Sequence, residues 1–68
     1  MKNCIRALRK ARGLRQEDLA ALLGVSRQTI IAMENDKDDP SLALAMRLAR
    51  LLERPVEEIF FLEENKTE

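Results

Sequence analysis

The stretch Gln16–Glu34, QEDLAALLGVSRQTIIAME, decides the fold. In its first half, apolar residues recur at the spacing of one face of a helix. They are Leu19, Ala20, Leu22 and Leu23. Gly24 then interrupts the pattern, and a glycine just past a helix end commonly takes the left-handed cap conformation. The pattern therefore predicts a short helix over 16–23 that ends at Gly24.

A second short helix is expected over 27–35. Ser26 is a good N-cap because its hydroxyl can accept a backbone N–H from the next turn. Ile30 and Met33 then lie at i and i+3 on one face. Two helices joined by so tight a turn cannot lie antiparallel, so they cross steeply in helix-turn-helix geometry. Ala20 lies where the helices meet, and its small side chain permits close approach.

Polar side chains crowd the exposed start of this second helix, at Arg27, Gln28 and Thr29. On an arbitrary helix they would form an ordinary solvated face, but directly after this turn they are placed to reach DNA. Gln28 can bind N6 and N7 of adenine together, and Arg27 can bind guanine or a phosphate. Ile31 can pack on a thymine methyl, and Ala32 is small enough to let the helix lie deep in the groove. Base contacts are therefore expected from Arg27, Gln28, Ile31 and Ala32.

Three segments together resemble the Cro/C1-type (XRE-like) helix-turn-helix family of transcriptional regulators. They are GLRQEDLAALLGVSRQTI, AMEND and PSLALAMRLARLLERPVEEIF, and the resemblance covers Ile5 to Phe60. Counting from Gln16, the positions of Ala20, Gly24 and Ile30 are those where the family has a small residue, a glycine and a β-branched residue. The resemblance implies an all-α, five-helix, lambda-repressor-like DNA-binding domain.

The resemblance also implies roles outside the base contacts. It pairs Arg9 with Glu34 in a structural salt bridge, and it places Gln16 on the DNA backbone. Arg15 stands where family members usually have a Ser or Thr N-cap, so the helix loses a cap worth ~1 kcal/mol. Acidic residues in the first turn partly compensate, and Arg15 can instead reach a phosphate. Phosphate contacts are thus expected from Arg12, Arg15, Gln16, Ser26, Thr29, Asn35 and Lys37.

Charge is unevenly distributed along the chain. The net charge is zero, which by itself argues against a nucleic-acid partner. However, residues 1–52 carry ten Lys/Arg against six Asp/Glu, a net charge of +4, whereas residues 53–68 carry two against six, a net charge of −4. A basic front and an acidic end fit a domain that turns one side to a polyanion. Ordinary mixing of surface charges is the alternative explanation.

Three further helices are expected around the motif. The first spans about 4–12, is capped by Asn3 and ends at Gly13. The next opens at Ser41, and a fifth has Pro55 in its first turn. The helix after Ser41 has a broad apolar face of Leu42, Leu44, Ala45, Leu48, Ala49, Leu51 and Leu52, and Met33 and Met46 are expected to fill the core.

The helical period stops after Phe60, where FFLEEN begins a short β-prone run. This run can pair with residues 1–4 in a two-stranded β element, an arrangement that the sequence leaves open. Residues 1–68 are expected to form one domain, with the helix-turn-helix core at 16–35 and a dimerisation segment at about 55–65. Its exposed apolar side chains are the expected homodimer surface: Val56, Ile59, Phe60, Phe61 and Leu62.

Composition excludes several other classes of protein. There is no histidine, and Cys4 is the one cysteine, which excludes a zinc finger, an internal disulfide and histidine-based catalysis. No cofactor, metal or small-molecule ligand is expected. No apolar run approaches the ~18 residues of a membrane span. A lone cysteine without a signal peptide favours a cytoplasmic location.

The sequence therefore predicts a DNA-binding transcriptional regulator, interpreted as a repressor that binds a palindromic operator as a homodimer through the major groove. The alternative is an antitoxin-like or co-regulator module that uses the same fold to bind a protein through its apolar and acidic end. An enzyme is not expected, because no catalytic constellation is present.

Overall fold

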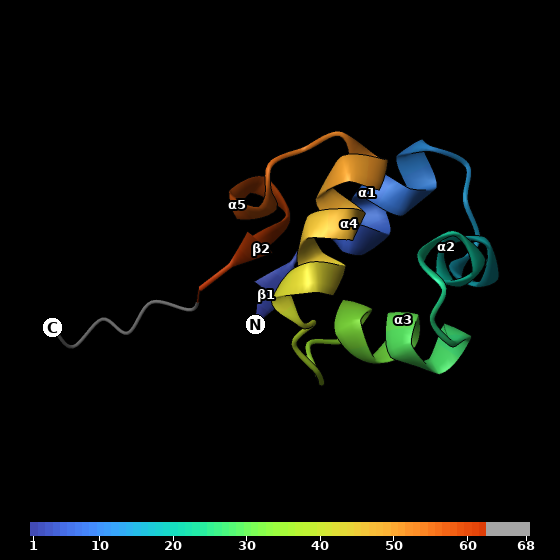
Figure 1. Ribbon diagram of the computed structural model, residues 1–68, viewed down its shortest axis with the longest axis horizontal. Helices are drawn as coiled ribbons and strands as arrows, with labels where there is room; N and C mark the ends of the chain where they lie inside the picture. The colour runs from blue at the N-terminus through green and yellow to red at the C-terminus, as the bar shows by residue number, and fades with distance from the viewer. Residues whose placement is uncertain (63–68) are drawn as a thin grey trace, which may run out of the picture.

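The computed structural model describes residues 1–62, which fold into helices closed at one end by a small sheet (Figure 1). Within these residues the elements are β1 (Lys2–Asn3), α1 (Ile5–Ala11), α2 (Gln16–Leu23), α3 (Arg27–Glu34), α4 (Leu42–Leu52), α5 (Val56–Ile59) and β2 (Phe60–Phe61). The mostly helical, five-helix fold class expected from the sequence is confirmed within these residues. No helix in the described part of the chain is long and apolar enough to cross a membrane.

The two ends of the described chain pair in an antiparallel sheet. Lys2 faces Phe61 and Asn3 faces Phe60, and the Cys4 N–H donates to the Ile59 carbonyl at 2.9 Å. The β element left open by the sequence is therefore present, and it forms within one chain. Residues 63–65 of the expected dimerisation segment lie outside the described residues.

Local capping signals decide where the helices begin and end. Gly24 ends α2 with φ +73°, and the hydroxyls of Ser26 and Ser41 accept the backbone N–H of Thr29 and Leu44 at the starts of α3 and α4. These caps were expected. Asn3 acts one residue earlier than a standard N-cap, because its Oδ1 accepts the N–H of Ile5 at 3.1 Å.

Each helix contributes an apolar face to one core. The α2 and α3 pair is the most extensively packed of the helix pairs, and Ala20 is buried, as close helix approach requires. The core residues are Ile5, Leu19, Ala20, Leu23, Ile30, Met33, Ala45, Leu48, Leu52, Ile59 and Phe60. This core holds α3 against the rest of the domain.

Two expectations about apolar residues of α4 are wrong. Met46 is 51% exposed and Leu42 is 73% exposed, whereas both were expected in the core. The buried side of α4 is formed by Ala45, Leu48 and Leu52. Met46 is one residue past Ala45 and therefore turned about 100° around the helix from it, and Leu42 lies in the first turn, beyond the packed part of the helix.

The expected exposed surface near the C-terminal end also needs correction. Ile59 and Phe60 are buried in the core, because pairing of β2 with β1 folds this segment back onto the domain. Val56 is half-buried and packs against the same core. Of the five expected dimer residues, only Phe61 and Leu62 are exposed. Ile59 and Phe60 stabilise the core of the domain and offer no free surface.

Candidate nucleic-acid interface

The turn between α2 and α3 fixes the angle at which α3 leaves the domain. Gly24 adopts the left-handed conformation, and the Val25 N–H returns to the Ala20 carbonyl at 3.0 Å. The Arg47 guanidinium of α4 donates to the Leu23 carbonyl, which satisfies a backbone group that the helix end leaves free. The turn is thus held by hydrogen bonds to two carbonyl groups of α2, one from the Val25 N–H and one from the Arg47 side chain of α4.

One face of α3 is buried and the opposite face is open. Ile30 and Met33 are fully covered. The helical period of 3.6 residues places Gln28 and Asn35 on the opposite side, and both are exposed. Ile31 and Ala32, also expected to contact bases, flank this open side and are half-buried.

The start of α3 presents its polar side chains outward. The Arg27 side chain is 57% exposed. Gln28 is also exposed, and its side chain has no hydrogen-bond partner among residues 1–62. Thr29 is half-buried, and its hydroxyl lies 3.1 Å from that of Ser26. The described part of the chain therefore leaves this end of α3 accessible.

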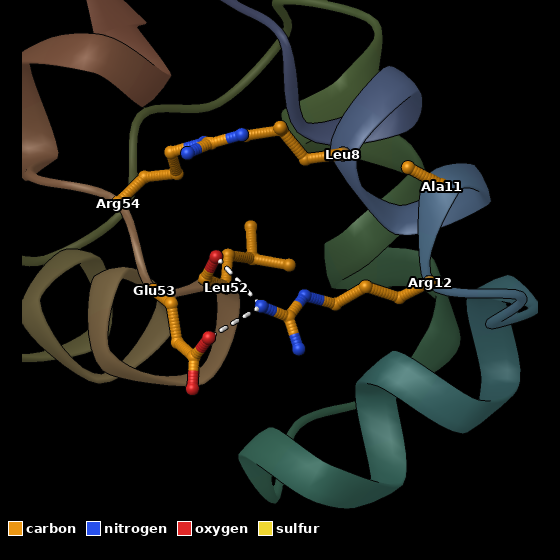
Figure 2. Close-up of a pocket in the computed structure, with 6 residues that line it drawn as sticks. All are labelled: Leu8, Ala11, Arg12, Leu52, Glu53 and Arg54. Atoms are coloured by element: carbon orange, nitrogen blue, oxygen red, sulfur yellow. Dashed lines mark hydrogen bonds and ion pairs between the residues drawn. The ribbon is translucent and has the colours of Figure 1, made fainter.

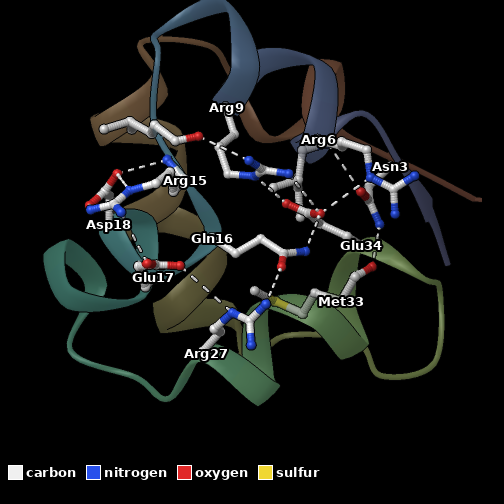
Figure 3. A network of polar contacts seen from close by, with 12 residues as sticks. Asn3, Arg6, Arg9, Arg15, Gln16, Glu17, Asp18, Arg27, Met33 and Glu34 are labelled. Carbon is white, nitrogen blue, oxygen red and sulfur yellow. Dashed lines mark hydrogen bonds and ion pairs between the residues drawn. The ribbon is translucent and has the colours of Figure 1, made fainter.

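Glu34, the last residue of α3, is the centre of a polar network (Figure 3). Its carboxylate accepts from Arg9 at 2.7 Å (Nε) and 3.2 Å (Nη2), and also from Gln16 at 3.1 Å and Arg6 at 3.4 Å. Arg9 in addition donates to the Leu14 carbonyl at 2.9 Å. The Arg9–Glu34 salt bridge implied by the family resemblance is present, and it ties α1 to α3.

Burial and hydrogen bonding act in opposite directions on Glu34. Burial alone raises the pKa of its carboxyl group, but the hydrogen bonds from Arg9 and Gln16, the charge of Arg9 and the hydrogen bond from Arg6 outweigh it. The pKa of Glu34 is therefore lowered from its ordinary value. The side chain is 0% exposed and that of Arg9 is 8% exposed, so this charge pair is largely removed from water.

Gln16 links the Glu34 network to the open end of α3. Its amide nitrogen donates to Glu34, and its amide oxygen accepts from Arg27 Nη2 at 3.5 Å. Arg27 Nε also lies 3.8 Å from a carboxylate oxygen of Glu17. Gln16 and Arg27, each predicted from the sequence to contact DNA, therefore contact each other. Neither this contact nor the approach of Glu17 to Arg27 is predicted by the sequence pattern.

Arg15 occupies the N-cap position of α2 without capping it through its side chain. Instead, Asp18 accepts the Arg15 backbone N–H at 2.8 Å, and its carboxylate pairs with the Arg15 guanidinium at 3.1 and 3.2 Å. Hydrogen bonds from the Arg15 side chain and then from its backbone lower the pKa of Asp18. In the free protein, the Arg15 guanidinium is thus paired with the Asp18 carboxylate.

Of the remaining expected phosphate contacts, Arg12 is held away from the others. Its guanidinium donates to the Leu52 carbonyl at 3.1 Å and to Glu53 at 3.2 Å, at the C-terminal end of α4 (Figure 2). It lines a hollow of about 330 Å³ there.

Asn35, in contrast, lies at the end of α3, where its side-chain oxygen accepts from Arg6 at 3.1 Å. Lys37 is exposed in the loop that follows. The structure thus groups Asn35 and Lys37 with α3 and separates Arg12 from it.

This arrangement of two crossing helices with exposed polar side chains on the second defines a helix-turn-helix DNA-binding fold. The sequence model of the Helix-turn-helix family (HTH_3) matches residues 5–59, and the chain belongs to this family. Its relatives are transcriptional regulators, and the chain is a transcriptional regulator with this fold.

Two relatives match over almost their whole length. The uncharacterized HTH-type transcriptional regulator MJ0272 of Methanocaldococcus jannaschii is 50% identical over 66 residues, which cover 97% of this chain and 100% of the relative. The uncharacterized HTH-type transcriptional regulator YgzD of Bacillus subtilis is 41% identical over 64 residues, covering 94% and 97%. Among solved structures, the restriction-modification controller protein C.AhdI from Aeromonas hydrophila is similar, with a TM-score of 0.73, 38% identity, and coverage of 82% of this chain and 85% of that one.

Proposed function

We propose that the chain acts as one DNA-binding domain and as a repressor, which binds a palindromic operator as a homodimer with α3 in the major groove. The observation that carries the proposal is the exposure of Arg27 and Gln28 at the start of α3. Ile30 and Met33 anchor the opposite face of the same helix in the core. A helix packed against the core with exposed hydrogen-bonding side chains at its N-terminal end matches the recognition helix of this motif.

The base contacts would come from Arg27 and Gln28, with Ile31 and Ala32 along the groove wall. Gln28 offers a donor and an acceptor that match adenine, and Arg27 offers two donors that match guanine. Ile31 and Ala32 are half-buried, so their contacts would be apolar and short. Phosphates would be bound around them by Arg15, Gln16, Ser26, Thr29, Asn35 and Lys37.

A homodimer follows from the size of this contact surface. One such unit reads only a few base pairs, whereas specific binding at physiological salt needs a larger interface. Leu62 is 79% exposed and Phe61 44% exposed. Phe60, the residue before them, lines an apolar groove of about 260 Å³ together with Met1, Pro40, Leu42, Ala45 and Val56. This face is the proposed dimer surface, and repression would result from occupying promoter DNA.

The test is selection of binding sites from a random duplex pool, followed by affinity measurements on the selected site. We expect two inverted half-sites about one helical turn, ~34 Å, apart, and an affinity that falls steeply with salt. Arg27→Ala and Gln28→Ala should each weaken binding about tenfold or more, since a good bidentate base contact is worth ~1–3 kcal/mol. Circular dichroism should show an unchanged fold.

Arg54→Ala is the matched control for Arg27→Ala. It removes the same charge from an exposed residue just after α4, where it lines the hollow beside Arg12 rather than α3 (Figure 2). It should leave site affinity almost unchanged. Absence of duplex binding at low salt, together with a tight protein partner, would contradict the proposal and favour the protein-interaction module.

A further inference from the structure

Glu17 lies on the proposed DNA-contacting side of the domain. Its carboxylate carries a negative charge, as a phosphate of the DNA backbone does. It is in the first turn of α2, between two arginines from different elements. One carboxylate oxygen is 3.3 Å from Arg15 Nη1, and the other is 3.8 Å from Arg27 Nε. Figure 3 shows the Glu17 side chain beside both guanidinium groups. One carboxylate thus holds two cations that are both expected to contact DNA.

The other edges of these two guanidinium groups are also engaged. Asp18 accepts from Nε and Nη2 of Arg15, and the Gln16 oxygen accepts from Nη2 of Arg27. The two arginines are therefore balanced by two carboxylates, and this cluster carries no net charge. The N-terminal end of α2, a favourable phosphate site in other respects, is electrically neutral in the free protein.

We propose that Glu17 sets the specificity of DNA binding by holding Arg15 and Arg27 away from the phosphate backbone, so that duplexes of unrelated sequence bind weakly. The proposal rests on the function proposed above. Binding to unrelated DNA depends almost entirely on phosphate charge, and Glu17 both competes for the cations and repels the backbone. A matching site also supplies base contacts, for which Arg27 is kept oriented between Glu17 and Gln16.

Exposure of the cluster allows this exchange to occur. The side chains of Glu17 and Arg27 are 54% and 57% exposed, and ion pairs in contact with water are weak. A phosphate in the right place can therefore displace Glu17 from either arginine. Glu17 therefore weakens binding that depends on phosphate charge alone, but it does not prevent a well-placed phosphate from reaching Arg15 or Arg27.

Glu17→Gln tests the proposal, with Glu57→Gln as the matched control. Both residues are exposed and lie in the first turn of a helix, but Glu57 is on α5, far from α2 (Figure 1). At low salt, Glu17→Gln should bind an unrelated duplex about three- to tenfold tighter, and the slope of log K against log salt should steepen by about one. Affinity for the selected site should rise less, so the ratio of the two affinities should fall about threefold or more.

The outcomes separate this inference from the function on which it rests. An affinity ratio and a salt slope equal to those of Glu57→Gln, while Arg27→Ala still weakens site binding, would overturn the role of Glu17 and leave the DNA-binding function intact. No duplex binding by the unmodified protein or by Glu17→Gln would overturn both. A fall in the ratio with an unchanged circular dichroism spectrum would support the role of Glu17.

Discussion

Replacing Glu34 by glutamine is expected to destabilise the domain strongly, although the change is nearly isosteric. Glu34 accepts hydrogen bonds from three side chains on two helices, those of Arg9, Gln16 and Arg6. Glutamine keeps the shape but has one acceptor oxygen, and its NH₂ group would face donors. The Arg9 guanidinium, 8% exposed, would lose its counter-charge.

The magnitude follows from the burial of the pair. Breaking a buried ion pair by removing one partner costs about 3–5 kcal/mol. The retained oxygen and the Leu14 carbonyl, which still accepts from Arg9, place Glu34→Gln near the lower end, at about 3 kcal/mol. A chain of 68 residues has a total stability of about 3–10 kcal/mol, so the variant should lie close to its unfolding limit.

Urea and thermal unfolding followed by circular dichroism at 222 nm provide the assay. A loss of about 3 kcal/mol corresponds to a midpoint lowered by about 12–24 °C in a domain of this size. Glu57→Gln removes the same charge from an exposed position and should change stability by less than about 0.5 kcal/mol. Equal stability of the two variants at pH 7 would refute the assignment of Glu34 as a buried, paired charge.

Other predictions concern pH, caps, the turn and association. Because the Glu34 pKa is lowered in the folded state from its ordinary value of 4.5, its stabilisation is complete above that ordinary value and is lost as pH falls through the folded pKa. The gap between the urea midpoints of the parent and Glu34→Gln should therefore narrow progressively as pH falls below 4.5, and a constant gap would argue against this linkage. Ser41→Ala should cost about 1 kcal/mol in thermal unfolding without changing DNA affinity. Gly24→Ala should cost about 1–2 kcal/mol, since φ is +73° and an L-residue is strained there; an unchanged melting temperature would contradict this. Leu62→Asp should weaken dimerisation in sedimentation experiments, and an unaltered dimer would exclude this face.

Helix boundaries and the turn were predictable because they depend on short-range rules. Gly24, Ser26 and Ser41 act on backbone groups within a few residues of themselves. The Arg9–Glu34 pair was expected from the family resemblance rather than from spacing. The caps follow from local rules, whereas the Arg9–Glu34 pair joins residues 25 positions apart, which no local rule supplies.

The environment of apolar residues near the C-terminal end could not be predicted in the same way. Whether Phe60 or Phe61 points inward depends on pairing with Lys2 and Asn3, more than fifty residues away in the sequence. A one-residue shift in strand register would exchange the two sides. For Met46, the apolar face of α4 was too broad for periodicity to decide which edge packs.

The contacts of Glu17 and Arg12 were missed for a related reason. Both side chains are long and have many rotamers, and their partners lie on other elements, Arg27 at the start of α3 and Glu53 after α4. Which oppositely charged groups meet depends on how the helices cross. The DNA contacts of Arg27, Gln28, Ile31 and Ala32 stay predictions.

The most direct test of DNA recognition by α3 is a titration of ¹⁵N-labelled protein with the selected duplex, followed through backbone amide NMR signals. We predict that the largest shifts fall at Gln16 and over residues 26–31, with α5 changing little. Shifts confined to α5 and β2, with the amides of α3 unmoved at saturating duplex, would contradict the proposed function.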